Sequence, residues 1–456
     1  MRSRINAQRE LDFRPAISSL TIEFCQKYET ISNTLDENPE IVSLIHQELT
    51  KVPSQIGGSP SRYTSDTVLR VLVVMIAEGL SLRDTVVRVD DSHYLRRFVR
   101  IYDLAMMDYT TLCKLKNQIA PETWTTVNEI LARYAVENEK ISGDLLRIDT
   151  TAIETDVHYP SDSSLLWDTY RTLAGLIERV RSIDPDLVGK GRIHRKRAKR
   201  LAQKIGRLTR KMRYREQMAD AYETLISMAS RIISWSRSIA EELEIKGATR
   251  ECKNAADLRQ RLIRYVDLGS RVVDQAQRRV LNGEQVPNEE KIFSIFEEHT
   301  ELLKRGKAKR DIEYGHMIQI QQVTEKFITD YTVFDKKPVE WKLLGTIVDS
   351  HESLFGEAPV TLAADRAYYQ GDAIALIEGR VTHVAVGKKG RGAKHDREKT
   401  QEFQDAQRFR AGVEGSIAFL KRCLMLGRIL CKGFAHYAAT VGMTVLTHNL
   451  IVLSRL

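Results

Sequence analysis

The sequence predicts an α/β protein in which a small mixed sheet is combined with many helices. Two short apolar runs with strand character, 145–149 and 360–365, each end on an aspartate. Two further stretches, 312–323 and 327–334, alternate in polarity and are rich in β-branched and aromatic residues, with Glu325 and Lys326 as the turn between them. Long helical stretches separate these runs, and this order favours a sheet covered by helices.

Residues 1–140 are predicted to be entirely helical. Ser65 or Asp66 can cap a helix that runs through Ile76, and Ser81 has the spacing of a capping box with Asp84. Asp108 and Pro121 are the usual kinds of residue at the start of two more helices. Short helices with tight joints and many cations are typical of helix-turn-helix units, so we expect a DNA-binding domain over 1–140. A helical bundle with solvated cations is the alternative.

The remaining strand-like segments are predicted to form one catalytic domain from residues 141–162 and 312–456. A weakly alternating stretch over 153–159 ends at Pro160. A helix fits 339–354, and 381–386 has the character of one more strand. A long helix is expected from about Gln401, followed by an apolar helix that ends at Leu453.

Residues 163–311 are predicted to be a helical, basic insertion in that domain. Residues 190–215 contain thirteen Lys and Arg and no acid, although the whole chain has a formal net charge of only +9. A helical segment without balancing acids is suited to contacts with nucleic-acid phosphates, and a solvated coiled-coil arm is the alternative. Whether the insertion grips DNA or forms a dimer stays open. The DNA-contact candidates here are Arg195, Lys196, Arg197, Lys199 and Arg200.

Composition excludes several classes of protein. Apolar residues make up 42% and charged residues 29%, which is typical of a globular protein, and the excess of cations favours a polyanionic partner. The five cysteines form no C-x-x-C pair, so neither a disulfide scaffold nor a zinc finger is expected. We find no signal peptide, membrane-spanning run or phosphate-binding G-x-x-x-x-G-K-[ST] motif. These observations predict a cytoplasmic protein with no membrane partner and no nucleotide cofactor.

Three carboxylates form the candidate active site. Asp149 and Asp365 end two strands, where α/β sheets bind ligands. In the helix from Gln401, the positions of Arg410, Glu414 and Lys421 fall within about 40° of one another at 100° per residue. Three carboxylates at one sheet edge can hold divalent cations for in-line attack on a phosphodiester, with the two cations beside Glu414 contacting phosphates.

Other assignments of these residues remain open. The structural alternative is that Arg410 and Glu414 form an ordinary surface ion pair. Nearby acids also compete for each place in the site: Glu402 and Asp405 for Glu414, Asp144, Asp156 and Asp162 for Asp149, and Asp372 for Asp365. The basic loop over 387–399 is expected to lie on DNA near the site, through Lys388, Lys389, Arg391 and Lys394.

The order strand–Asp, strand–Asp, helix–Glu resembles the DDE transposases of bacterial insertion sequences. Arg410, Glu414 and Lys421 match the Y-x2-R-x3-E-x6-K signature of that family, with Gln407 where Tyr is usual. Residues 148–163 are similar to the stretch V-D-G-T-V-I-E-S-N-V-H-Y-P-T-D-S of the ISNCY-type branch, with Thr150 in place of Gly. Residues 290–301 look like another block of that branch, and the resemblance extends from about residue 60 to the end.

This resemblance implies an RNase H-like catalytic domain and a reaction. Asp149, Asp365 and Glu414 would bind two Mg²⁺ ions, for which Mn²⁺ can substitute, and Arg410 and Lys421 would contact DNA nearby. The implied partner is double-stranded DNA, as terminal inverted repeats and as target, bound by a homodimer. The implied reaction is nicking at the element ends followed by transfer of the 3′-hydroxyl strand. Two alternatives are a catalytically inactive DNA-binding repressor and an RNase H-like nuclease that acts on RNA–DNA hybrids or branched DNA.

Overall fold

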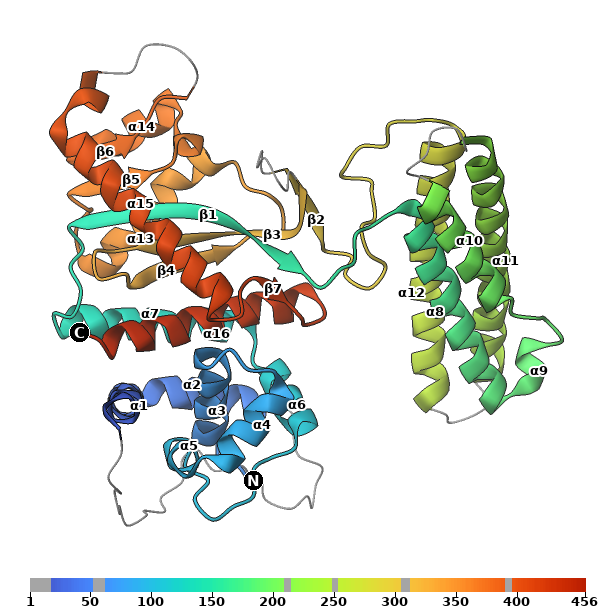
Figure 1. Ribbon diagram of the computed structural model, residues 1–456, viewed down its shortest axis with the longest axis horizontal. Helices are drawn as coiled ribbons and strands as arrows, with labels where there is room; N and C mark the ends of the chain where they lie inside the picture. Colours follow the sequence, from blue (N-terminus) through green and yellow to red (C-terminus); the bar gives the residue numbers. More distant parts are fainter. Residues whose placement is uncertain (1–17, 52–61, 209–214, 248–252, 305–311, 390–395) are drawn as a thin grey trace. The chain divides into compact units, whose positions relative to one another are not determined.

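A computed structural model describes residues 18–51, 62–208, 215–247, 253–304, 312–389 and 396–456. The chain divides into two compact units (Figure 1). The sheet unit comprises Met1–Asp156 and Arg305–Leu456, and the helical unit comprises Val157–Lys304. The predicted α/β class with a mixed sheet is confirmed.

The sheet unit is built on a central strand that has an antiparallel neighbour on one side and a parallel neighbour on the other. Strands β3, β1, β5 and β6 are neighbours in that order, and β4 also pairs with β3. β1 runs antiparallel to β3 and parallel to β5, β4 is antiparallel to β3, and β6 is parallel to β5. The two-residue β7 pairs with the end of β1. The strands are β1 (Leu145–Thr155), β3 (Ile312–Gln322), β4 (Ile328–Val333), β5 (Thr361–Ala364), β6 (His383–Val386) and β7 (Arg428–Ile429).

Local sequence signals account for most of these strand boundaries. The predicted turn between β3 and β4 is confirmed, with Lys326 in the left-handed region at φ 67°. The two separate segments expected over 145–149 and 153–159 are instead one strand that ends at Thr155. This strand continues because β3 pairs with it without interruption from Arg147 to Glu154.

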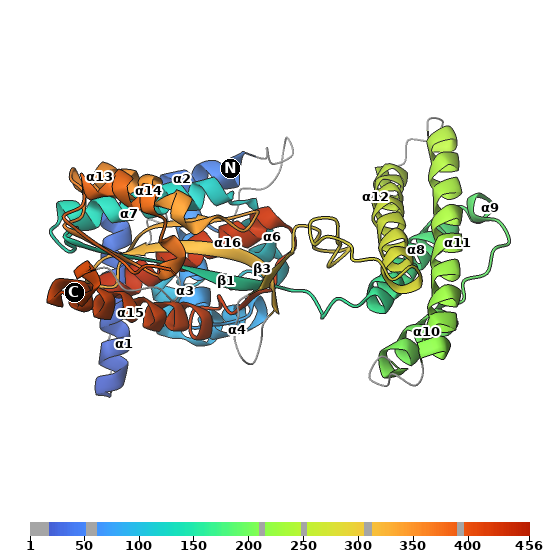
Figure 2. The same cartoon turned by 90° about the horizontal axis from the view of Figure 1, so that it is seen from above.

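Helices cover both faces of the sheet. Leu146 and Ile148 of β1 pack against α13 (Leu344–Phe355) and α14 (Gly371–Glu378). The short helices η3 (Glu340–Leu343) and η4 (Arg366–Tyr368) precede these two helices in turn. On the other face, Ala363 and Ala385 pack against Ala406 of α15 (Gln401–Arg422), which follows η5 (Asp396–Lys399). Figure 2 shows α13 and α14 on one side of the strands and α15 on the other.

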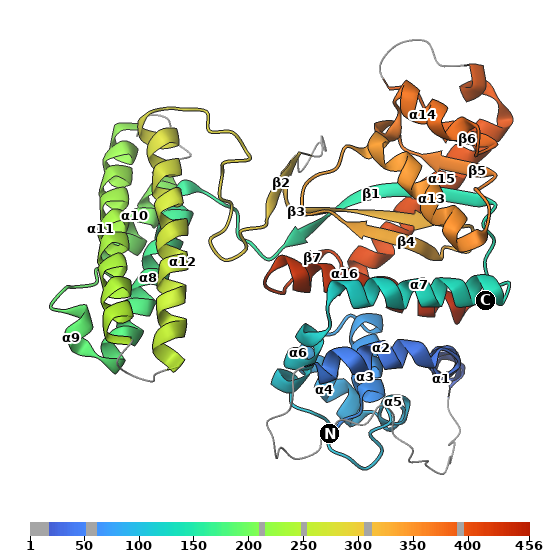
Figure 3. The ribbon, with the colours of Figure 1, turned by 180° about the vertical axis from the view of Figure 1, so that it is seen from behind.

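The N-terminal helices share one hydrophobic core with the C-terminal helix and with strands β3 and β4. α7 and α16 run side by side in Figure 3, and the buried Asn128 of α7 donates to the Gly442 carbonyl oxygen of α16. The N-caps predicted at Ser81 and Asp108 are confirmed, whereas Thr64 rather than Ser65 or Asp66 caps α3. These helices are α1 (Ser19–Glu37), α2 (Pro39–Thr50), α3 (Ser65–Ala77), α4 (Leu82–Asp91), α5 (His93–Phe98), α6 (Tyr109–Gln118), α7 (Pro121–Glu137) and α16 (Phe434–Leu453).

The helical unit has a hydrophobic core of its own, formed mainly by its long helices. It comprises α8 (Asp162–Ile183), α9 (Pro185–Val188), α10 (Arg195–Leu208), α11 (Arg215–Gly247), α12 (Lys253–Ala276), the π-helix η2 (Gln277–Leu281) and the short strand β2 (Glu301–Lys304). Residues 163–311 were expected to be helical with breaks at Pro185 and Pro287, but the interruption at Pro287 is longer than expected, because residues 282–300 form turns and irregular chain. Gly283 at φ 72° and Pro287 interrupt the helical pattern there.

Two further observations concern cysteines and hydrophobic helices. Cys25, Cys113, Cys423 and Cys431 form no disulfide with one another, and Cys252 lies outside the described residues. Within the ranges that the structure describes, no helix combines the length and the apolar character needed to cross a bilayer.

Candidate metal and nucleic-acid site

Asp149 lies within β1, and Asp365 directly follows the neighbouring strand β5, so the prediction that Asp149 ends its strand is wrong. In the parallel pair, Arg147 of β1 stands opposite Ala363 of β5. This is the last residue pair of that register, and Asp149 and Asp365 each come two residues later in the chain. Neighbouring strands are about 4.8 Å apart, so the two backbones are close at this point.

Both aspartates belong to the face of the sheet that α15 covers. Arg147 contacts α15 directly, since its Nη1 donates to the Phe409 carbonyl oxygen at 2.8 Å. Ala363 packs against Ala406 of the same helix. Side chains two residues apart on a strand share a face, so Asp149 and Asp365 are directed toward α15 as well. Asp365 keeps an extended backbone at φ −69° and ψ 161°, which maintains this alternation.

Helix α15 presents one narrow stripe to the ends of these strands. Gln407, Glu414 and Lys421 are spaced by seven residues, so successive members lie within about 20° of one another around the helix. Gln407 Nε2 donates to the carbonyl oxygens of Ala364 and Ala385, at 3.2 and 2.5 Å. At the other end, Lys421 Nζ donates to the Ala152 carbonyl oxygen at 2.6 Å.

These two contacts determine where Glu414 lies. The stripe is held at the residue before Asp365 and again three residues beyond Asp149. Glu414 is halfway between, about 10 Å along the helix from either contact. Glu414 is thus on the side of α15 whose neighbouring members contact β1, β5 and β6.

The carboxylates of Asp149, Asp365 and Glu414 do not surround a common point, and each contacts a different group. Asp149 Oδ1 accepts the Thr150 backbone N–H at 2.8 Å, and Asp365 Oδ1 accepts that of Arg366 at 2.5 Å. The Glu414 side chain is 69% exposed and lies 3.6 Å from Arg410 Nη2. Among the described residues, no three His, Cys, Asp or Glu side chains are close enough together to form a metal-binding group.

A fourth carboxylate near Asp149 was not predicted. Glu340 Oε1 accepts a hydrogen bond from Thr150 Oγ1 at 2.5 Å, on the residue that follows Asp149. Burial, together with the negative charges of Glu340 and Asp149, holds the pKa of the Tyr368 hydroxyl well above its usual value. No signal in the sequence marks Glu340, because its position depends on how η3 packs against β1.

The competing acids have partners elsewhere. Asp162 is buried and bonds Arg279 Nη1 through both carboxylate oxygens at 2.9 Å, and Asp156 lies 3.4 Å from Arg428 Nε. Asp405 bonds Arg408 at 2.6 Å. Asp144 bonds Ser142, and Asp372 bonds Gln370. Each of these acids therefore has a hydrogen-bond or ion-pair partner within the fold.

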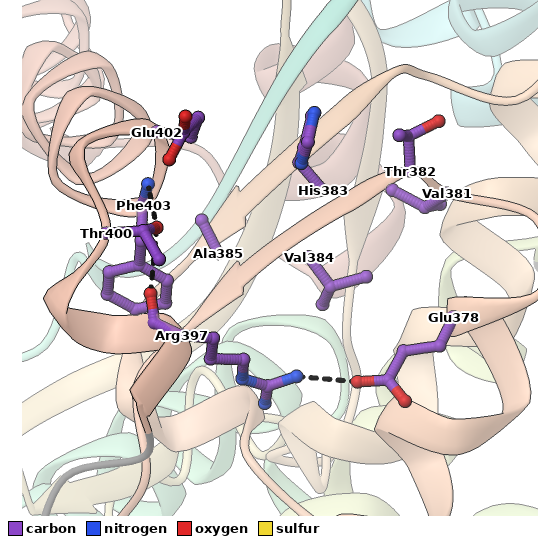
Figure 4. A pocket seen from close by; sticks show the side chains of 10 residues that line it. All are labelled: Glu378, Val381, Thr382, His383, Val384, Ala385, Arg397, Thr400, Glu402 and Phe403. Carbon is purple, nitrogen blue, oxygen red and sulfur yellow. Dashed lines mark hydrogen bonds and ion pairs between the residues drawn. The ribbon is translucent and has the colours of Figure 1, made fainter.

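Glu402 lines a groove of about 380 Å³ beside β6, and neither Asp149 nor Asp365 lines this groove. Val384 and Ala385 form its floor, and the ion pair between Arg397 and Glu378, at 2.6 Å, crosses one side (Figure 4). Lys388 and Lys389, two of the predicted DNA contacts, are exposed just beyond β6. Arg391 and Lys394 lie outside the described residues.

In the helical unit, α10 presents most of its cations to solvent. Ala198 and Ile205 are buried against the bundle core, whereas Lys196, Arg200 and Arg207 follow the opposite face and are exposed. Arg197, Lys199 and Lys204 are exposed on the flanks. Arg195 differs from them because its Nη2 pairs with Glu178 at 3.0 Å. No acidic residue occurs in α10 itself.

Residues 1–140 were expected to bind DNA through their cations, but several of these side chains form ion pairs or hydrogen bonds within the fold. Arg100 pairs with Asp36 at 2.6 Å and with Asp66 at 3.0 Å. Arg96 donates to backbone carbonyls, and Lys116 donates to Thr440 at 3.1 Å. Arg83 and Lys114 are exposed.

Comparison with known proteins gives no assignment: no protein-family model, curated protein or solved structure matches the chain.

Proposed function

We propose that the chain is a DDE transposase of an insertion sequence with an RNase H-like catalytic domain. The observation that supports this proposal is the attachment of α15, which carries Glu414, to β5 through Gln407 and to β1 through Lys421, since Asp149 belongs to β1 and Asp365 follows β5. A strand order with antiparallel pairs on one side of β1 and parallel pairs on the other supports the proposed fold. The residue identities of the family signature agree with it.

Divalent ions suit this donor set, because all three groups are hard oxygen ligands on one side of the sheet. Asp149, Asp365 and Glu414 would hold two Mg²⁺ ions, or Mn²⁺ in their place. Bound there, these ions supply charge neutralisation at the attacking and leaving oxygens of a phosphodiester. Arg410 would orient Glu414 and contact the DNA backbone, and Lys421, which β1 already holds, would fix the helix.

The proposed reaction has two steps. A water oxygen attacks phosphorus at the element end, and the 3′-oxygen leaves and takes up a proton. That 3′-hydroxyl then attacks a target phosphodiester, and the target's own 3′-oxygen leaves. Double-stranded DNA is the partner in both steps, bound by a homodimer through the exposed cations of α10 and the loop after β6.

The test uses a labelled duplex that carries the ends of the element encoding this chain. Cleavage in Mg²⁺ should disappear in EDTA and fall by at least about 1000-fold in Asp149→Asn, Asp365→Asn and Glu414→Gln. Glu402→Gln is the matched control, since it makes the same change in the same helix and should leave cleavage intact. Specific binding without cleavage in any divalent ion would favour the repressor, and preference for RNA–DNA hybrids would favour the nuclease.

A further inference from the structure

Arg147 of β1 is a buried cation with no carboxylate partner among the described residues. Its side chain is 4% exposed. A buried guanidinium is costly unless its donors are satisfied, and a paired acid is the usual solution. Arg147 instead contacts α15, and these contacts indicate that it helps to hold that helix in position.

Three groups hold the guanidinium in place. Nε and Nη2 both donate to Gln322 Oε1 of β3, at 2.9 and 2.6 Å. Nη1 donates to the Phe409 carbonyl oxygen at 2.8 Å, and the guanidinium carbon lies 4.6 Å from the centre of the Phe409 ring. Gln322 Oε1 also accepts from Ser416 Oγ at 3.0 Å. The network thus joins β1 and β3 to the turns of α15 on either side of Glu414.

Gly412 shows how closely the helix approaches. A Cβ atom added at Gly412 would overlap with Nη1 of Arg147. Glycine is unfavourable inside a helix, so its presence here fits a requirement for this close approach. Gly415, three residues further along the same helix, has nothing within 4 Å of an added Cβ. An added Cβ therefore meets Arg147 at Gly412 and open space at Gly415.

We infer that Arg147 is a positioning residue, which anchors α15 through Phe409 and Gly412 so that Glu414 is presented to Asp149 and Asp365. This inference rests on the proposed function for its consequence in catalysis. The anchoring of α15 by Arg147 is supported independently by the contacts of its guanidinium with Gln322 and Phe409.

The experiment compares Gly412→Ala with Gly415→Ala. Because a shift of the order of 1 Å in a reacting group can cost about 100-fold, we expect Gly412→Ala to lower the turnover rate by up to about 100-fold. DNA affinity should stay within about twofold of the wild type, since the exposed cations are untouched. Gly415→Ala should retain both rate and affinity. Equal rates for the two variants would overturn the inference.

A double-mutant cycle separates the anchor from general destabilisation. In an Arg147→Met background the added methyl group no longer meets the guanidinium, so Gly412→Ala should have little further effect on the rate. Additive effects would contradict the anchor. Hydrogen exchange provides a readout without catalysis: amides of residues 409–416 should lose protection in Gly412→Ala but not in Gly415→Ala. If the wild-type chain cleaves no DNA, the proposed function fails, and this exchange comparison alone decides for or against the anchor.

Discussion

His448 lies in α16 with 3% of its surface exposed, and its Nε2 contacts the Lys326 carbonyl oxygen at 2.9 Å. Burial lowers its pKa to about 4, whereas an unfolded histidine has a pKa of about 6.5. The unfolded state therefore binds more protons as the pH falls from 6.5 to 4, and the folded state loses stability over that range. Above pH 6.5 both states are neutral at this position and there is no effect.

The His448→Gln variant isolates this contribution. Between pH 8 and pH 5 the wild-type chain should lose about 2 kcal/mol more unfolding free energy than the variant, measured by urea denaturation. His351, whose pKa burial also lowers to about 4, is present in both proteins and cancels in the comparison. Equal losses in the two proteins would show that His448 titrates normally in the folded state.

At the scale of the element, the exposed face of α10 makes a quantitative prediction about DNA binding. Each phosphate contact contributes about 0.9 to the slope of log affinity against log salt concentration. Lys196→Gln, Arg200→Gln and Arg207→Gln together should therefore flatten the slope by up to about 2.7, while glutamine preserves the helix. The control removes the same charge from exposed positions on α11 and α12, by Arg231→Gln, Arg237→Gln and Arg271→Gln. An unchanged slope in the α10 variant would make this helix a structural arm.

The elements differ in how far the sequence determined them. The presence of strands at 145–149 and 361–364 was predictable, because short apolar runs followed by an acid are local signals, but the continuation of β1 beyond Asp149 to Thr155 was not. The N-cap residue of α3 could not be predicted, because Thr64, Ser65 and Asp66 are adjacent and all can cap a helix. Contacts of Arg147 and Glu340 depend on the register of β1 against β3 and on the packing of η3, which no local pattern encodes.

For the whole molecule, the two units have separate hydrophobic cores, and the chain leaves and re-enters the sheet unit at neighbouring points. Residues Leu165 to Ile295 supply the core of the helical unit, and none of them contributes to the cores of the sheet unit. β1 and β3 are antiparallel, with Glu154 opposite Gly315 close to where the helical unit begins and ends. A short connection can therefore join the two strands as a hairpin.

Replacing Val157–Lys304 with a short Gly/Ser linker should leave a folded sheet unit. Because the hydrophobic cores of the sheet unit contain no residue of the deleted segment, the shortened chain should unfold in one cooperative transition and retain a circular dichroism spectrum with both helix and strand. Its DNA affinity should fall and become less dependent on salt, since α10 is removed. A shortened chain that is soluble but lacks a cooperative transition would show that the helical unit is required for the sheet to fold, and that the separate cores are not independent in stability.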